Sequence, residues 1–316
     1  MKNIDLAWIL LILLVAAFFL YYKEDVKDII RDNIIIKEVA RNDDETGYYD
    51  QSNISYSSSG LVEESKEDFI TGSEYNFDKE YYVYYSFLSE DGKKIYKQVY
   101  ANALVYNETF RTITKISTSE LSDVMEALFN DHPELFYLDT NYLYKYNSKG
   151  MCIEITLNYN DTIDNIGRSK ELFEIEVNKI VEEASKLASD YEKEKYVYMT
   201  LIKKVDYDKN AQYNQSAYSA LVVGKSVCAG YARAFQLIMQ KLKIPTYYVL
   251  GFAKEDHAWN VVKLNGRYYN VDLTWDDTGS IFKHFNISDS DMEFTHRRSG
   301  ISNNLPKCLN GNYNLG

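Results

Sequence analysis

The sequence predicts an α+β protein in which a helix packs beside a β-hairpin, and two neighbouring stretches support this prediction. From residue 228 onward, apolar side chains recur at helical spacing: Tyr231, Phe235, Ile238, Met239 and Leu242. Pro245 ends the helix, because proline cannot continue its hydrogen-bond ladder. Residues 257–264 and 267–275 follow as two strands around Asn265-Gly266, a strong signal for a two-residue turn.

The hairpin places two polar side chains close together. The two-residue turn sets the register, so that His257 faces Thr274 and Trp259 faces Asp272. Asp272 is then the diagonal neighbour of His257 on the same face of the sheet. We therefore expect a carboxylate–imidazole hydrogen bond between His257 and Asp272.

Cys228, His257 and Asp272 occur in that order along the chain. A thiol, an imidazole and a carboxylate are the nucleophile, base and orienting group that thiol acyl chemistry requires. Ser226 is expected to cap the helix, which puts Cys228 in its first turn, where unpaired backbone N–H groups favour a thiolate. A single cysteine at a helix start is most often a small buried residue. The three residues together, in this order and with this hairpin, favour the catalytic interpretation.

The resemblance to a known family is carried by three segments: 227–232 (VCAGYA), 257–260 (HAWN) and 270–276 (NVDLTWD). Together they resemble the transglutaminase-like superfamily and are most similar to its bacterial, membrane-anchored, peptidase-like branch. The resemblance extends over about residues 165–290. It implies a transglutaminase-like, papain-like cysteine proteinase fold, in which the cysteine opens a helix and the histidine and aspartate lie on adjacent strands.

The same resemblance implies a role for each of the three polar residues. Cys228 attacks an amide carbonyl, His257 transfers the proton, and Asp272 holds the imidazole in the useful tautomer. This chemistry requires no cofactor and no metal. The sequence contains no Cys/His cluster with metal-ligand spacing.

Four further residues are candidates for supporting the site. The oxyanion would be bound by the Cys228 backbone N–H and by one more donor, for which Gln215 and Tyr218 are both candidates. Trp259 and Trp275 are expected to shield and pack the site.

Two classes of function are consistent with these residues. The first is an enzyme that cleaves or transfers an acyl group at amide bonds; we favour a protease or peptidase acting on protein or cell-wall peptide, with a protein cross-linking transglutaminase as the alternative. The second is a catalytically idle scaffold or binding module with the same fold. Competent residues at all three polar positions argue against the second class.

Composition excludes other partners and narrows the roles of the remaining cysteines. A net charge of -12 over 316 residues argues against nucleic acid as a partner. Three cysteines do not form a disulfide framework. Cys152 and Cys308 are expected to be plain thiols, although a single bridge between them stays open.

The chain divides into four expected parts. Residues 1–22 contain an uncharged apolar run, 6–22, just long enough to cross a bilayer; a cleavable signal peptide is the rival interpretation. Residues 23–73 have the composition of a flexible stalk. Residues 74–162 and 163–316 follow as a small α+β domain and the catalytic domain. We expect a single-pass cell-membrane protein with its catalytic domain outside, although the distribution of Lys and Arg around the apolar run leans the other way.

Within the small domain, residues 81–88 and 93–106 are expected to be strands around Asp91-Gly92, and Thr118 or Ser119 is expected to cap a helix. A second hairpin joins residues 142–146 to 152–157. His132 is expected to be structural. In the catalytic domain, the further expected elements are helices over 169–188 and 192–204, a short strand over 282–288 and a loop from 297.

Overall fold

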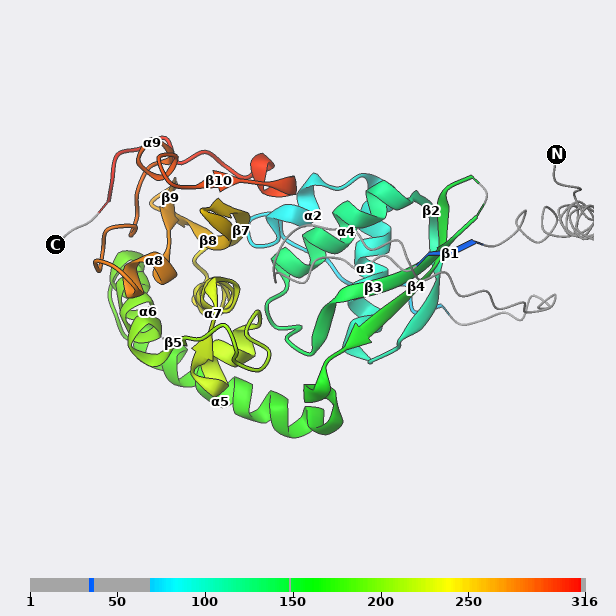
Figure 1. Ribbon diagram of the computed structural model, residues 1–316, viewed down its shortest axis with the longest axis horizontal. Helices are drawn as coiled ribbons and strands as arrows, with labels where there is room; N and C mark the ends of the chain where they lie inside the picture. The colour runs from blue at the N-terminus through cyan, green and yellow to red at the C-terminus, as the bar shows by residue number, and fades with distance from the viewer. Residues whose placement is uncertain (1–33, 37–68, 148, 314–316) are drawn as a thin grey trace, which may run out of the picture.

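The computed structural model describes residues 34–36, 69–147 and 149–313, which form a mixed α/β protein with two four-stranded sheets (Figure 1). The apolar run 6–22 and nearly all of the stalk lie outside these residues. Within the part of the chain that is described, no helix is long and apolar enough to span a membrane. We call residues 34–36 together with 69–162 the small region, and residues 163–313 the large region.

The sheet of the large region is antiparallel, with the strand order β10-β7-β8-β9. Its strands are β7 (Thr246–Ala253), β8 (Glu255–Leu264), β9 (Arg267–Val271) and β10 (Arg297–Arg298). The turn between β8 and β9 has positive φ at both Asn265 and Gly266, as a type I′ hairpin requires. Leu264 pairs with Arg267, so the predicted register is confirmed for this hairpin.

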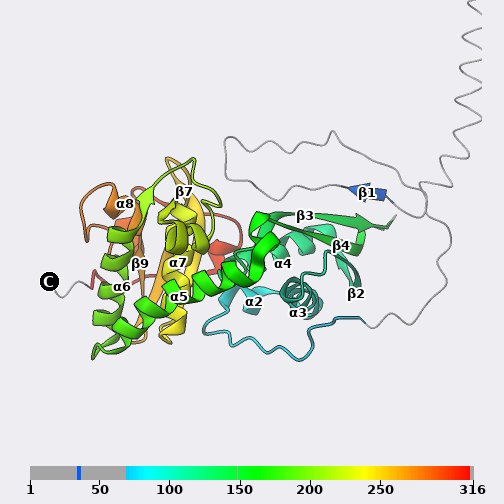
Figure 2. The ribbon, with the colours of Figure 1, turned by 90° about the horizontal axis from the view of Figure 1, so that it is seen from below.

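Helices cover this sheet on one side (Figure 2). They are α5 (Ile166–Ser185), α6 (Asp190–Lys204) and α7 (Cys228–Lys241). The predictions of helices at these three places are confirmed within a few residues. Before α7, β5 (Asp206–Tyr207) and β6 (Lys225–Ser226) pair in parallel, and a π-helical turn lies at Ser219–Val223.

Two predictions in the large region are wrong. The strand expected to run to residue 275 ends at Val271, because Asp272 turns the chain into a short helix, α8 (Leu273–Asp277). The strand expected over 282–288 is irregular backbone with one isolated bridge, Asn270 to Ile287. The end of the chain holds α9 (Asp289–Met292), β10 and a 3₁₀ turn, Gly300–Asn304.

The small region packs three helices against a sheet with the order β1-β3-β4-β2. The helices are α2 (Val83–Phe87), α3 (Glu90–Leu104) and α4 (Thr118–Asp131). The strands are β1 (Ile34–Ile36), β2 (Thr109–Ser117), β3 (Leu138–Tyr146) and β4 (Met151–Tyr159). The predicted hairpin is confirmed as β3 and β4, and the helix expected from Thr118 or Ser119 is confirmed as α4, with Ser117 as its cap.

The two strands predicted over 81–88 and 93–106 are wrong, since these residues form α2 and α3. Ser89 caps α3 by accepting from the Gly92 N–H, and Glu90 and Asp91 lie in its first turn. Asp91-Gly92, which looked like a hairpin turn, is therefore the start of a helix.

A single hydrophobic cluster runs through both regions. Phe136, in the segment before β3, stacks on Phe173 of α5 and on Tyr218, with ring centroids 4.6 and 4.8 Å apart. His132 lies within an aromatic group of this core, against Tyr100 at 4.3 Å, and accordingly has a structural environment. The small region therefore shares its core with the large one.

Candidate active site

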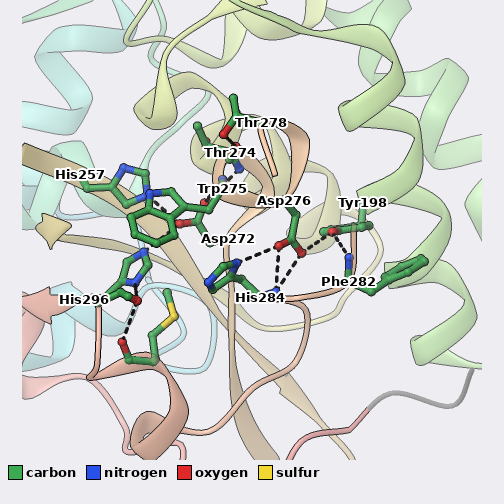
Figure 3. A network of polar contacts seen from close by, with 12 residues as sticks. Tyr198, His257, Asp272, Thr274, Trp275, Asp276, Thr278, Phe282, His284 and His296 are labelled. Atoms are coloured by element: carbon green, nitrogen blue, oxygen red, sulfur yellow. Dashed lines mark hydrogen bonds and ion pairs between the residues drawn. The ribbon is translucent and has the colours of Figure 1, made fainter. Parts of the chain in front are cut away.

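His257 and Asp272 form a buried hydrogen-bonded pair beside α7 (Figure 3). His257 Nε2 lies 2.7 Å from Asp272 Oδ2. The two residues are 6% and 0% exposed, so water does not compete for this bond. The contact predicted from the hairpin is present.

The way in which Asp272 reaches His257 differs from the prediction. The pairing of β8 with β9 ends at Asn260 and Val271, and His257 pairs instead with Gly251 of β7. Asp272 is the N-cap of α8, and its Oδ1 accepts from the backbone N–H groups of Thr274 and Trp275. A helix cap, rather than a strand diagonal, orients the carboxylate.

Cys228 is the first residue of α7 and is partly exposed. The residue that caps this helix is Val227, without a side-chain bond; Ser226, the predicted cap, instead donates its hydroxyl to the Asn214 carbonyl. Cys228 packs against a small apolar group that includes Ala258, next to His257 in the chain. The Cys228 thiol is also a hydrogen-bond partner of the His257 imidazole.

Asn260 joins the helix that carries Cys228 to the strand that carries His257. Its Nδ2 donates to the Ala232 carbonyl of α7 at 3.0 Å, and Asn260 is fully buried. This bond accounts for the asparagine in the HAWN segment, because a fixed spacing between α7 and β8 keeps the thiol and the imidazole in contact.

Electrostatics favour a charged imidazole between two anions. Burial disfavours the imidazolium, but the Asp272 carboxylate and the Cys228 thiolate outweigh it and raise the pKa of His257 to about 10. Burial also disfavours the carboxylate, yet the charge of His257 and hydrogen bonds from His257 and His296 hold the pKa of Asp272 well below its usual range. The site is therefore built for an imidazolium, which is the partner that a nucleophilic thiolate requires.

The two predicted packing residues both lie near His257. The Trp259 ring is stacked on the imidazole at 6.1 Å, and the Trp275 ring is tilted toward it at 6.2 Å. Trp259 is 2% exposed and donates its indole N–H to Asn270 Oδ1. Both rings therefore line the imidazole, in the places expected of them.

The two residues predicted as oxyanion donors have different surroundings. Gln215 belongs to a segment that packs against the start of α7, where the Val227 N–H donates to the Asn214 carbonyl. The Tyr218 ring is buried in the aromatic stack with Phe136 and Phe173. Gln215 lines a cavity of about 210 Å³ between the two regions, and its backbone carbonyl accepts from Arg233 Nη1. The packing of Tyr218 removes it from the site, because its ring serves the core between the two regions.

Sequence reasoning missed two residues of the site. His296 bonds to Asp272, and Tyr207 lies next to Cys228, whose charge raises the pKa of the Tyr207 phenol in addition to burial. His296 follows the irregular segment after α9, so no local pattern signals its position. Tyr207 lies in β5, whose pairing with the residues just before Cys228 depends on the tertiary fold.

The side chains of His257, Asp272 and His296 offer ligand atoms within 4.8 Å of one another. Two ligands of a tetrahedral metal at ~2.05 Å would be about 3.3 Å apart. The observed N–O distances of 2.7 and 3.0 Å are shorter and match charge-assisted hydrogen bonds. Hydrogen bonding accounts for the spacing of this cluster.

A second buried network lies beside the first along α8 (Figure 3). Asp276 accepts from His284 Nδ1 at 2.8 Å and from the Tyr198 hydroxyl at 2.5 Å. Asp277 accepts from the Tyr231 hydroxyl. Neither acid bonds to His257, in agreement with the prediction that Asp272 is its partner.

The fold and the site together define a mixed α/β protein with a thiol at a helix start and a buried imidazole–carboxylate pair on the adjoining sheet. Residues 178–273 match the model of the Transglutaminase-like superfamily. These residues therefore form a transglutaminase-like domain, and the predicted resemblance to the superfamily is confirmed. The match includes Cys228, His257 and Asp272, and ends before His296.

The chain aligns with only part of the length of each relative described here. Over 117 residues the chain is 28% identical to the kyphoscoliosis peptidase of mouse (Mus musculus), which covers 31% of this chain and 17% of that protein. A candidate cysteine protease structure from Cytophaga hutchinsonii is 18% identical with a TM-score of 0.28, covering 39% of this chain and 51% of that one. A TGase structure is 16% identical with a TM-score of 0.32, covering 55% and 52%.

Proposed function

We propose that the protein is a cysteine enzyme that acts on amide bonds of peptide or protein substrates, with Cys228 as nucleophile. One observation supports this most: the buried 2.7 Å bond between His257 and Asp272, with the partly exposed thiol of Cys228 beside the same imidazole. A histidine with a purely structural role does not require both a buried carboxylate partner and a partly exposed thiol beside it.

In the first half of the reaction, the Cys228 thiolate attacks the carbonyl carbon of the amide, and a C–S bond forms. The carbonyl oxygen becomes an oxyanion, which the Cys228 backbone N–H at the start of α7 stabilises. As the C–N bond breaks, the imidazolium of His257 gives its Nδ1 proton to the leaving amine. The products are a free amine, a thioester on Cys228 and a neutral imidazole.

In the second half, a nucleophile attacks the thioester and His257 Nδ1 takes its proton. The C–S bond breaks, and the thiolate and imidazolium are restored. Asp272 stays ionised throughout and keeps Nε2 protonated, so that Nδ1 faces the reaction. Water as nucleophile makes the enzyme a peptidase, and an amine makes it a transglutaminase. We favour the peptidase, and the mouse relative at 28% identity carries that name.

The test is turnover of a quenched-fluorescent casein, measured with and without a fluorescent primary amine. We expect loss of quenching with the wild-type protein and complete loss of activity with Cys228→Ala. Cys152→Ala is the matched control, because Cys152 is 1% exposed and burial raises the pKa of its thiol to about 12. Incorporation of the amine in place of cleavage would reassign the activity to transglutamination.

Alkylation distinguishes the enzyme from the idle scaffold. With iodoacetamide at pH 6, Cys228 should react selectively, since burial also raises the pKa of the Cys308 thiol to about 12. Slow and equal labelling of the three cysteines, together with no turnover of casein, would favour the scaffold and contradict this proposal.

A further inference from the structure

The carboxylate of Asp272 receives two imidazoles. His257 Nε2 lies 2.7 Å and His296 Nε2 lies 3.0 Å from the same oxygen, Oδ2 (Figure 3). The other oxygen, Oδ1, accepts from the backbone N–H groups of Thr274 and Trp275. Asp272 is thus a fully buried anion with four donors, of which only the contact with His257 was expected.

The Asp272 carboxylate selects the tautomer of His296. The Nδ1 of His296 lies 2.7 Å from the Thr295 hydroxyl. An ionised carboxylate only accepts, so Nε2, which lies 3.0 Å from Asp272 Oδ2, carries the proton. In a neutral ring Nδ1 is then the acceptor, and the Thr295 hydroxyl is shared between it and the Met292 carbonyl at 3.3 Å. His296 can therefore donate to the carboxylate without being charged.

The surroundings of His296 favour its neutral form. It is 3% exposed, and its ring lies against Trp275 at 4.6 Å and Trp259 at 5.1 Å. Burial lowers the pKa of His296, the Asp272 carboxylate opposes this, and the positive charges of His257 and His284 lower it further. Besides these three, the titratable groups near the pair are Cys228 on α7 and Asp276 on α8, the latter bonded to His284.

Strand pairing delivers His296 to this position. It immediately precedes β10, in which Arg298 pairs with Gly251 of β7, and Gly251 also pairs with His257 on β8. A Cβ at Gly251 would lie 2.2 Å from the Arg297 carbonyl and 2.5 Å from the Trp259 ring. The glycine therefore allows the end of the chain to approach the sheet closely enough for His296 to reach Asp272.

We propose that His296 is a positioning residue of the site: as a neutral donor to Oδ2, it holds Asp272 ionised and aligned, so that His257 keeps Nδ1 turned toward Cys228. A hydrogen bond to the ionised form of a carboxylate favours that form. Without His296, Oδ2 would keep His257 as its single partner, and the alignment of the carboxylate would depend on that bond and on the two backbone bonds to Oδ1. The role in catalysis rests on the function proposed above, whereas the tautomer and the contact do not.

The first test is the nitrogen spectrum of the wild-type protein labelled with ¹⁵N-histidine. At pH 7 we expect His296 to be neutral with its proton on Nε2, and the proton between His257 and Asp272 to appear far downfield. An imidazolium at His296, or a proton on Nδ1, would overturn the proposal even if the protein is an active enzyme.

The second test compares turnover of the casein substrate by three variants. His296→Leu removes the donor, and we expect kcat to fall about tenfold or more, in the range of partners that orient a reacting group, with KM unchanged. His296→Gln keeps an N–H at the place of Nε2 and should recover most of this loss. His284→Leu is the matched control: His284 is an equally buried histidine, but it binds Asp276, so kcat should stay near that of the wild type.

The downfield proton separates positioning from general loss of structure. It should persist in His296→Gln and His284→Leu and disappear by exchange in His296→Leu. Full kcat in a folded His296→Leu variant, or an equal loss in His284→Leu, would contradict the proposed role. Absence of turnover in the wild type would overturn the proposed function, and the nitrogen spectrum would then decide on the contact alone.

Discussion

Tyr207 is the side chain best placed to act as the second donor to an oxyanion. In the parallel pair of β5 and β6 it lies opposite Ser226, two residues before Cys228. Side chains two apart on an extended segment share a face, and Val227 between them is extended. The loop after β5 is joined to the start of β8 by the ion pair of Lys209 and Glu255. Tyr207 therefore lies between the segments that lead to the thiol and to the imidazole.

We predict that Tyr207→Phe lowers kcat about 100-fold, the usual effect of removing one oxyanion donor, with little change in KM. The phenol has no other hydrogen-bond partner within the described part of the chain. Burial, followed by the charge of the Cys228 thiolate, raises its pKa, so it stays protonated and able to donate. The measurement is steady-state turnover of casein peptides. Tyr106→Phe, in the small region, is the control, and equal rates for the two variants would exclude Tyr207 as a donor.

At the scale of elements, Glu194 joins α6 to the irregular segment that the sequence predicted as a strand. Its Oε2 accepts from Asn286 Nδ2 at 2.8 Å, and the residue is fully buried. Glu194 Oε1 and Asn286 Oδ1 are both buried without a donor. A protonated Glu194 carboxyl would provide a hydrogen-bond donor at this place. Burial raises the pKa of Glu194 to about 8, although the hydrogen bond from Asn286 lowers it.

The pH dependence of stability follows from this shift. The folded protein binds the Glu194 proton more tightly than the unfolded chain, where the ordinary pKa is 4.5. Stability should therefore fall as pH rises from about 4.5 to 8. We predict that Glu194→Gln removes this contribution and stabilises the protein above pH 8, by a few kcal/mol at most, since one pKa unit is ~1.36 kcal/mol.

The measurement for Glu194→Gln is urea denaturation across that pH range. Glu182→Gln, on the exposed side of α5, is the control and should keep the slope of the wild type. A slope that survives in Glu194→Gln would show that another group carries the pH dependence.

Predictions of helices and strands were correct where the local sequence favours one conformation. They were wrong where the same residues are compatible with both helix and strand. The turn at Asn265-Gly266 has one preferred conformation, so the hairpin and its register followed from it. In α3, by contrast, aromatic and β-branched residues favour a strand by propensity. Their burial at Ile95, Tyr96 and Val99 against the neighbouring helix and sheet overrides that preference.

At the scale of the whole molecule, the shared core couples the two regions. Phe136 is 4% exposed and contributes from the small region to a stack with residues of the large one. The hydroxyl of Tyr84, on α2, also contacts Ser302 near the end of the chain, at 2.8 Å. The contact of Tyr84 with Ser302 joins residues 218 positions apart. One hydrophobic cluster includes residues of both regions, so neither region encloses its own core.

We predict that Phe136→Ala lowers the free energy of unfolding by ~3–5 kcal/mol, the usual cost of truncating a buried phenylalanine. It should also shift the unfolding of both regions together. Far-UV circular dichroism reports on both regions, whereas the fluorescence of Trp259 and Trp275 reports on the large region. The unfolding transitions measured by these two methods should coincide.

Phe294→Ala is the control, because Phe294 is 84% exposed, and its effect should stay within ~0.5 kcal/mol. Separate transitions by the two probes in Phe136→Ala would mean that the small region folds independently.

The sequence alone determined the helix that begins with Cys228, the β8–β9 hairpin and the proximity of Asp272 to His257. Each depends on signals within a few residues: apolar spacing, a proline, a two-residue turn. Only the tertiary structure decided that Asp272 caps a helix, that Tyr218 belongs to the core, and that His296 reaches the same carboxylate. These facts depend on contacts between segments distant in the chain. Packing sets such contacts, and no local pattern of residues predicts how distant segments pack.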